Sequence, residues 1–427
     1  MLLGLYGFIG IKGLNILQQT FNQNQNTDNS DIPSLDPRGE LLLELKEETP
    51  ISQIKAVLDQ FGIGFRRAFY PRYETLTDLD DYYVLDIPDD QINKLPEIEK
   101  RLYDTKLVDW IEENEVIAIS PVETNKLPIP IEKKFGINDP DVERLWSFNA
   151  MKVDAFYKKI NQTKIKPKRK ATVAILDTGV DALHEDLADN YISTKTKYDK
   201  DLQGHGTHCA GIAGAVSNNK IGVASLSQGN EFVQITSIPV LNNLGMGTQK
   251  SIIDGMIEAA DNRVDVISMS LGGESSPLKQ KAYEKVVQYA NEAGAIVVVA
   301  AGNSKANAKD YAPANVKGVI AVSAVDENLN RATFSNSVAD IAMGLAAPGV
   351  NIYSTFPKNE YKTFNGTSMA TPYVSGLAGV LKSIHPELNT KEVFQILDQS
   401  GLPTGTTQET GMFIQPANAI ISLANYE

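Results

Sequence analysis

The stretch Asn365–Pro372 reads NGTSMATP and places a serine between small residues, directly before an apolar run. That run predicts a helix over residues 368–385. Ser368 is therefore expected at a helix N-terminus, where free N–H groups and the positive end of the helix dipole favour negative charge. A nucleophile in this position has an oxyanion-binding amide beside it, whereas the simpler alternative for this stretch alone is an N-capping serine.

Two motifs lie upstream of this stretch. Val173–Val180 reads VAILDTGV, so that Asp177 ends an apolar strand, and functional groups gather at such strand ends in open α/β sheets. Gly204–Gly211 reads GHGTHCAG and places His205 at the start of a helix of small residues. Taken singly, Asp177 also suits a turn and His205 also suits a satisfied polar group. The order Asp, His, Ser is that of the subtilisin catalytic residues.

On these motifs the chain resembles the subtilisin-like serine proteases over about residues 135 to 427, with a matching propeptide before them. Further stretches fit the same family: VISMSLGG (Val266–Gly273), VVVAAGN (Val297–Asn303), VIAV (Val319–Val322), FSN (Phe334–Asn336) and APG (Ala347–Gly349). The resemblance implies an α/β fold, namely a three-layer domain with a mostly parallel central sheet, preceded by a small ferredoxin-like α+β domain. Alternating predicted strands and helices from 172 to 400 favour the same sheet.

Composition excludes several classes of protein. The chain has 427 residues, of which 42% are hydrophobic and 22% charged, as in a soluble globular protein. Its net charge is −13, and residues 40–120, with nineteen acidic and nine basic side chains, contribute −10 of it. No basic patch argues for a nucleic-acid partner. A single cysteine, Cys209, excludes an intrachain disulfide.

The N-terminal part divides into three segments. Residues 1–38 combine an apolar stretch (Met1–Ile16), interpreted as a degenerate or truncated export signal, with a polar linker. Residues 39–120 read as a strand (41–45), a helix (51–61), two strands (64–70 and 82–87), a helix (90–103, with Asp89 or Asp90 as its cap) and a strand (108–119), which is the split βαβ pattern. Residues 121–137 form a processing linker, and the catalytic domain spans 138–427. The alternative for the apolar stretch is a plain frayed N-terminus. We expect a secreted or cell-envelope protein, and the alternative location is the cytoplasm.

The resemblance assigns residues 39–120 to an inhibitory propeptide that occupies the substrate cleft in cis, so the chain's own segment is an intramolecular partner. An unrelated regulatory domain is the alternative. The resemblance also implies that Ser368 is the nucleophile, that His205 is its base and that Asp177 orients the imidazole. Asn303 and the Ser368 backbone N–H are the implied oxyanion donors. Polypeptides are the implied substrates of a monomeric enzyme.

The substrate is expected as an extended strand between two chain edges. By resemblance, Ser270, Leu271 and Gly272 form one edge, and Gly245, Met246 and Gly247 form the other. Leu271 with Ala300, Ala301 and Gly302 is expected to wall a primary pocket that favours large apolar side chains, and Tyr311 narrows its floor.

A structural calcium ion is the implied cofactor. Calcium prefers six to eight oxygen ligands, many of them carbonyls. The expected ligands are side chains of Asp139, Asp186 and Asn219 and the backbone oxygens of Ser217, Ile221 and Val223. A turn and a cap without metal form the alternative at this place.

Other readings of the motifs stay open at this stage. His205 and His208, with Asp177 or Asp181, are spaced to hold a metal, although the glutamate base of metallopeptidase helices is missing. Cys209 is expected as a buried thiol beside the site. Tyr373 stands where the family usually has histidine. Competing functions are a catalytically silent peptide-binding homologue and a dedicated maturation protease for one substrate.

Overall fold

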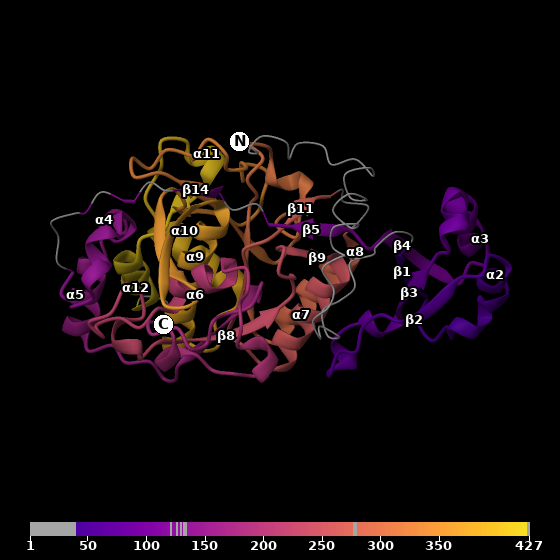
Figure 1. The fold of residues 1–427 in the computed structure, drawn as a ribbon, viewed down its shortest axis with the longest axis horizontal. Coiled ribbons are helices and arrows are strands. Elements are labelled where there is room, and N and C mark those ends of the chain that lie inside the picture. Colours follow the sequence, from indigo (N-terminus) through magenta and orange to yellow (C-terminus); the bar gives the residue numbers. More distant parts are fainter. Residues whose placement is uncertain are drawn as a thin grey trace. The chain divides into compact units, whose positions relative to one another are not determined.

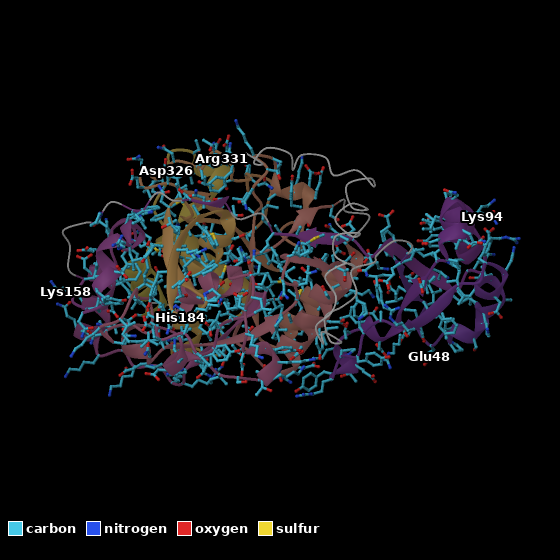
Figure 2. All side chains as sticks on the ribbon, viewed as in Figure 1. Glu48, Lys94, Lys158, His184, Asp326 and Arg331 are labelled. Atoms are coloured by element: carbon cyan, nitrogen blue, oxygen red, sulfur yellow. The ribbon has the colours of Figure 1, made fainter. Side chains whose placement is uncertain are left out.

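The computed structural model describes residues 40–119, 122–124, 127–128, 130, 135–275 and 280–424, and these described residues belong to one compact unit. The predicted segment 1–38 and most of the predicted linker 121–137 lie outside the described residues. Charged side chains such as Glu48, Lys94 and Lys158 are exposed and project from the ribbon (Figure 2). Among the helices described, none has both the length and the apolar character that a bilayer crossing requires.

A seven-stranded sheet forms the centre of residues 135–424, in the order β18-β15-β14-β12-β10-β7-β8 (Figure 1). Every neighbouring pair in it is parallel. Its strands are runs rich in valine, isoleucine and alanine, as a sheet buried on both faces requires. They are β7 (Ala171–Asp177), β8 (Val233–Pro239), β10 (Val266–Met269), β12 (Ile296–Ala300), β14 (Val319–Val325), β15 (Gly344–Pro348) and β18 (Met412–Phe413).

Alternate residues of each strand enter two different cores. In β7, Val173 and Ile175 belong to the core that contains residues of α6 and α9, whereas Ala174 and Leu176 belong to the core that contains residues of α7 and α8. Helices therefore cover both faces of the sheet, which confirms the predicted three-layer α/β fold. These helices are α6 (His205–Gly214), α7 (Gln249–Asp261), α8 (Lys281–Glu292) and α9 (Thr367–Ile384).

Several elements were not expected from the sequence. The hairpin of β16 (Ile352–Phe356) and β17 (Glu360–Asn365) turns through Lys358 and Asn359, both of which have positive φ. Glycine usually marks such turns, so its absence hides this one. Other elements outside the expectation are α4 (Trp146–Ala150), α5 (Val153–Thr163) and α12 (Pro416–Ala424), whereas α10 (Thr390–Ser400) was predicted.

Residues 40–113 form an antiparallel four-stranded sheet in the order β2-β3-β1-β4. This is the order of the split βαβ arrangement. One face, with Leu41, Leu43 and Leu45, packs on the helices of the same segment, while Leu42 on the opposite face joins the core of α7 and α8. The elements are β1 (Glu40–Leu45), α2 (Lys55–Gln60), β2 (Gly64–Arg67), β3 (Tyr82–Asp86), α3 (Leu95–Asp104) and β4 (Val108–Glu113).

Three details of this segment differ from the expectation. The predicted strand 64–70 ends at Arg67. The predicted helix 90–103 opens as a 3-10 turn, Asp89–Lys94, and neither Asp89 nor Asp90 caps α3. The predicted last strand, 108–119, is divided into β4 and β5 (Val116–Ala118), because β4 pairs with β1 whereas β5 pairs with β9 (Met246–Thr248).

Candidate active site

Asp177 and His205 meet at the carboxyl end of the central sheet. Asp177 is the last residue of β7, and His205 is the first of α6. The Nδ1 atom of His205 lies 2.8 and 2.9 Å from the two Asp177 carboxylate oxygens, and both side chains are fully buried. Burial by itself lowers the pKa of His205, but the adjacent carboxylate outweighs it and holds that pKa well above its usual value. The pair fixes the imidazole with Nδ1 protonated and Nε2 directed away from Asp177.

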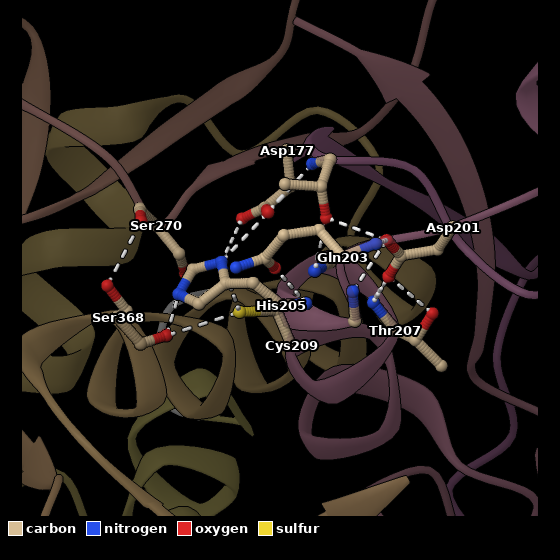
Figure 3. Close-up of polar contacts among 11 residues, drawn as sticks. Asp177, Asp201, Gln203, His205, Thr207, Cys209, Ser270 and Ser368 are labelled. Carbon is tan, nitrogen blue, oxygen red and sulfur yellow. Dashed lines mark hydrogen bonds and ion pairs between the residues drawn. The ribbon is translucent and has the colours of Figure 1, made fainter. Parts of the chain in front are cut away.

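Ser368 is the second residue of α9 and lies beside this pair (Figure 3). Its hydroxyl donates to the Ser270 carbonyl at 3.0 Å, and the Ser270 hydroxyl donates to the Ser368 carbonyl at 2.7 Å. The Nε2 atom of His205 is buried and has no hydrogen-bond partner among the described residues. An unpartnered buried nitrogen beside a hydroxyl is the arrangement that a base and nucleophile require.

Asp201 organises the loops around His205, and the sequence analysis missed it. Its buried carboxylate accepts bonds from the hydroxyls of Thr178 and Thr207 and from three backbone N–H groups, those of residues 203, 204 and 207 (Figure 3). Gly204 has φ of +101°, and a Cβ there would lie 2.1 Å from the Phe356 ring. Asp201 and Gly204 together hold the tight entry into α6. Nothing in the sequence marks Asp201, because three of its five donors are backbone N–H groups.

The predicted metal reading of His208 does not match the geometry. Among the described residues, the one group of three potential ligands is Asp177, His205 and Cys209, which includes neither His208 nor Asp181. His208 instead bonds the Lys362 carbonyl at 3.0 Å, and burial lowers its pKa to about 3. Cys209 is buried next to His205, as expected, and burial raises the pKa of its thiol.

Asn303 follows the last strand residues of β12 and faces the start of α9. Its Oδ1 atom accepts from the Thr367 N–H at 2.8 Å and from the Thr367 hydroxyl at 3.0 Å. Because the amide oxygen is held in this way, the Asn303 amide group offers its Nδ2 hydrogens to other acceptors. Thr367 was not singled out in the sequence, and it fixes which way this amide points.

The two predicted cleft edges hold a strand of the same chain. β5 pairs antiparallel with β9, placing Ile117 opposite Gly247 and Ala118 opposite Met246, and the Ile119 N–H donates to the Gly245 carbonyl at 2.9 Å. On its other side β5 contacts β11 (Gly273–Glu274), which continues the edge formed by Ser270, Leu271 and Gly272. Residues 116–119 therefore lie between both edges as an added strand.

The residues predicted to wall the primary pocket have little exposed surface. Leu271, Ala300 and Ala301 are buried, and Gly302 is half-buried. A Cβ on Gly302 would lie 3.3 Å from the Tyr311 ring, so the tyrosine stands beside the walls. None of these four wall residues carries a charge.

Carboxylates of the N-terminal segment contact the first turns of α7 and α8. Glu112 is buried and accepts from the N–H groups of Lys281 and Ala282 and from the Gln249 amide. Glu44 pairs with the ammonium groups of Lys281 and Lys285. Negative groups at helix N-termini are favourable because free N–H groups and the helix dipole meet them there.

The predicted calcium ligands lie close together. Asp139 accepts from the N–H groups of Asn218 and Asn219, while Asp186 accepts from the Asn219 amide and the Val223 N–H. Burial raises the pKa of Asp186 to about 7 and also raises that of Asp139. Neither carboxylate forms a salt bridge within the described residues. The backbone carbonyls of Ser217, Ile221 and Val223 belong to the same loop.

Tyr373 stands where the family usually has histidine, and its hydroxyl has a hydrogen-bond partner. Its hydroxyl lies 2.7 Å from the Ser147 hydroxyl, in the interior between α9 and α4. The substitution therefore changes a helix contact that lies away from His205.

Comparison with known proteins places these features in context. The sequence profile described as the Subtilase family matches residues 168–412. Thermitase of Thermoactinomyces vulgaris is 43% identical over 220 residues, which cover 50% of this chain and 75% of that protein. Subtilisin DY of Bacillus licheniformis is 40% identical over 240 residues, covering 55% of this chain and 84% of that protein.

A solved structure shows the same fold. A protease of Pseudoalteromonas arctica PAMC 21717 aligns with a TM-score of 0.59 and 27% sequence identity. The alignment covers 67% of this chain and 99% of that chain.

Proposed function

The chain belongs to the subtilase family of serine endopeptidases, and on this premise we propose that Asp177, His205 and Ser368 form its catalytic triad. The observation that carries the proposal is the imidazole of His205. Asp177 holds it through Nδ1, while its buried Nε2, beside Ser368, has no partner in the described part of the chain. The sequence contains all four of the proposed reactive residues, which argues against a catalytically silent binding protein.

The chemistry follows from these positions. The Ser368 hydroxyl turns from the Ser270 carbonyl towards Nε2, gives its proton to His205 and attacks the substrate carbonyl carbon. The Asn303 amide and the Ser368 N–H, which lies at the helix N-terminus, donate to the oxyanion. His205 then protonates the leaving nitrogen. In the second half of the reaction, water attacks the acyl carbon while His205 takes its proton, and His205 returns that proton to the Ser368 oxygen as the acyl group leaves.

Peptide substrates are proposed to bind as β5 does, between Gly245–Gly247 and Ser270–Gly272. The support is the strand pairing that residues 116–119 already make there. Leu271 and Ala300–Gly302 are proposed to wall the primary pocket, which favours large apolar side chains because no charged group from these residues faces it.

Residues 39–120 are proposed to act as the inhibitory propeptide of a zymogen. Their β5 strand occupies the substrate edges, and Glu112 and Glu44 hold α7 and α8 through buried contacts. The proposal includes cleavage in cis, within the linker 121–137, by Ser368. We also propose that the chain acts outside the cytoplasm, on the basis of the apolar stretch Met1–Ile16, and, separately, that it acts as a monomer.

A structural calcium ion is proposed at the loop 217–223. Asp139 and Asp186, two buried carboxylates without a cationic partner among the described side chains, lie beside a carbonyl-bearing loop, and this donor set suits calcium. The residues present therefore fit the ion. When bound, it would neutralise the two carboxylates and tie the loop to the start of the domain through Asp139.

A fluorophosphonate probe tests the catalytic assignment. Processed protein should react with the probe at one residue, which peptide mapping should locate at Ser368, and heat-denatured protein should not react. Ser368→Ala should abolish both labelling and peptide hydrolysis. Labelling of the native protein at another residue would contradict the proposal.

A further inference from the structure

One segment of this acidic chain is strongly basic. Residues 152–170 carry eight basic side chains and one acidic side chain, Asp154, so their net charge is +7. Because the whole chain carries −13, the residues outside this segment carry −20. The sequence analysis found no basic patch because negative charge dominates the chain as a whole, and this segment corrects that expectation. We propose that residues 152–170 form a docking surface for a linear phosphate polymer without nucleobases. The basic residues are Lys152, Lys158, Lys159, Lys164, Lys166, Lys168, Arg169 and Lys170.

Most of these charges lack an acidic partner. The helix α5 packs one side into the core, through Val153, Phe156, Tyr157 and Ile160. Lys158, on its other side, is exposed and projects from the ribbon (Figure 2). Lys168 pairs with Glu387 at 3.9 Å, and Arg169 pairs with Asp265. The other six lysines of the segment form no salt bridge with a described side chain, so their charge is open to an outside partner.

A hollow beside α5 gives this surface a place for a phosphate group. Its volume is about 390 Å³, and it lies between the C-terminal end of α5 and residues 228–232. Two lysines and one carboxylate, that of Glu231, leave its lining with a net charge of +1. Three amide side chains add N–H donors, which phosphate oxygens accept. The lysines are Lys164 and Lys166, and the amides are Asn161, Asn218 and Gln228.

The basic surface lies at the opposite end of the central sheet from Ser368. The Lys168 N–H donates to the Ser383 carbonyl at 2.8 Å, near the C-terminal end of α9, whereas Ser368 is the second residue of that helix. Fifteen helical steps of 1.5 Å separate Ser383 from Ser368, or about 22 Å. Likewise β7 begins at Ala171, directly after the basic segment, and ends at Asp177. A polymer on this surface would therefore leave the two cleft edges uncovered.

The composition of the segment favours a phosphate polymer over a lipid bilayer. None of the large apolar side chains in residues 152–170 is exposed. Binding at a bilayer surface draws on buried apolar area as well as on charge, so this segment lacks one of the two contributions.

The same composition disfavours nucleic acid as the partner. Seven of the eight cations are lysines, whose ammonium groups neutralise phosphate as point charges without reading a base edge. The single arginine, Arg169, is engaged by Asp265. The aromatic rings of the segment, Phe156 and Tyr157, are buried, so neither can stack on a base.

The test measures binding of long-chain inorganic polyphosphate at several salt concentrations. All samples are full-length protein carrying Ser368→Ala, so that self-cleavage does not change them. The patch variant replaces Lys158, Lys164, Lys166 and Lys170 by glutamine. The matched control replaces four exposed lysines elsewhere by glutamine, namely Lys305, Lys317, Lys358 and Lys391. Melting curves check that both variants are folded.

The background protein should bind polyphosphate with an affinity that falls as salt rises, because bound lysines release counterions. In the patch variant the slope of log affinity against log salt should be shallower by about 0.7 for each lost contact, and affinity at low salt should drop at least roughly tenfold. The control should stay within about twofold of the background, since its four lysines lie outside the segment.

Three further samples decide between occupants: vesicles of anionic lipid, duplex DNA, and the background protein alone in sedimentation experiments. Tighter patch-dependent binding to vesicles or DNA than to polyphosphate would overturn the inference. So would self-association of the protein alone that the patch variant abolishes, because the acidic residues 40–120 of a second copy would then be the occupant. Equal polyphosphate binding by the patch variant and the background, or no salt-dependent binding by the background, would overturn it as well. None of these outcomes bears on the proposed function, because every sample lacks the Ser368 hydroxyl.

Discussion

At the scale of single residues, the catalytic geometry depends on partners that carry no chemistry of their own. Asp201 anchors the loop before α6 through two hydroxyls and three backbone N–H groups, and Thr367 orients the Asn303 amide. Loss of the Asp201 carboxylate would leave its buried donors unsatisfied, at a cost on the order of 1–3 kcal/mol for each group. The loop before α6 would then be disturbed, and His205 with it, although Asp201 does not touch His205.

The ionisation of His205 gives a residue-scale prediction. Asp177 holds the pKa of His205 well above about 6.5, the ordinary imidazole value. Because the neutral imidazole is the base, peptide hydrolysis should rise with pH through this elevated pKa. The pair should stabilise the fold fully below about pH 6.5, and this stability should be lost as pH rises through the folded-state value.

Nuclear magnetic resonance of Ser368→Ala measures this titration directly, because the chain has four histidines and none between residues 40 and 120. Burial lowers the pKa of His184 and His208, so neither overlaps the high-pKa titration. Asp177→Asn serves as the control and should lower the His205 pKa, since the carboxylate that chiefly opposes the effect of burial is then lost. A His205 pKa below about 6.5 with Asp177 intact would refute the assignment.

Motifs in the sequence predicted which residues gather at the site. The structure brings Asp177 into contact with His205 and Asn303 into contact with Thr367 at the start of α9, while the catalytic roles of these residues stay predictions. Asp201 and Thr367 escaped because their roles consist of contacts with backbone groups, which no spacing rule in one sequence reveals. Tyr373 was noticed only as a departure, and its partner Ser147 lies more than two hundred positions away.

At the scale of elements, long apolar strands and helices were predicted and short pairings were not. The sequence predicted a single strand over 108–119, although the polar run EENE at residues 112–115 lies between its two apolar ends. In the structure it is two strands, because β4 pairs with β1 and β5 pairs with β9. The short strand β6 (Val122–Glu123) also depends on a distant partner, because it pairs with β17.

The loop 217–223 gives an element-scale prediction. In metal-free protein, burial raises the pKa of Asp186 to about 7. Its contribution to the stability of the fold is therefore fully present below about pH 4 and is lost as pH rises towards 7. Calcium should reverse this loss by favouring the ionised carboxylate. At a hundred times its dissociation constant, one ion stabilises by about 2.7 kcal/mol, so chelation should lower the melting temperature by several degrees.

Melting curves with calcium and with chelator, recorded at several pH values, check this expectation. Asp186→Asn should flatten the pH dependence and abolish the response to calcium, whereas the exposed neighbour Asp189→Asn should retain both. Identical curves for wild type with and without calcium would eliminate the proposed site.

At the scale of the whole molecule, two sheets share the helices α7 and α8. The central sheet packs on them in one core, to which Leu42 and Val84 of the N-terminal sheet also belong. The acidity of residues 40–120, net −10 of the total −13, is directed in part at Lys281 and Lys285. If residues 39–120 are the inhibitor that we propose, cutting the linker should leave them bound through the contacts of Glu44, Glu112 and β5.

The central claim is that Ser368 cuts the chain that carries it. The most direct test incubates full-length wild type and Ser368→Ala, each dilute and concentrated, and follows them by intact mass. Because a cut in cis is effectively unimolecular, wild type should convert to species starting between residues 121 and 139 with first-order, dilution-independent kinetics. Ser368→Ala should stay full length. Conversion of Ser368→Ala at the wild-type rate, or wild type that stays full length while it cleaves added peptides freely, would contradict the account.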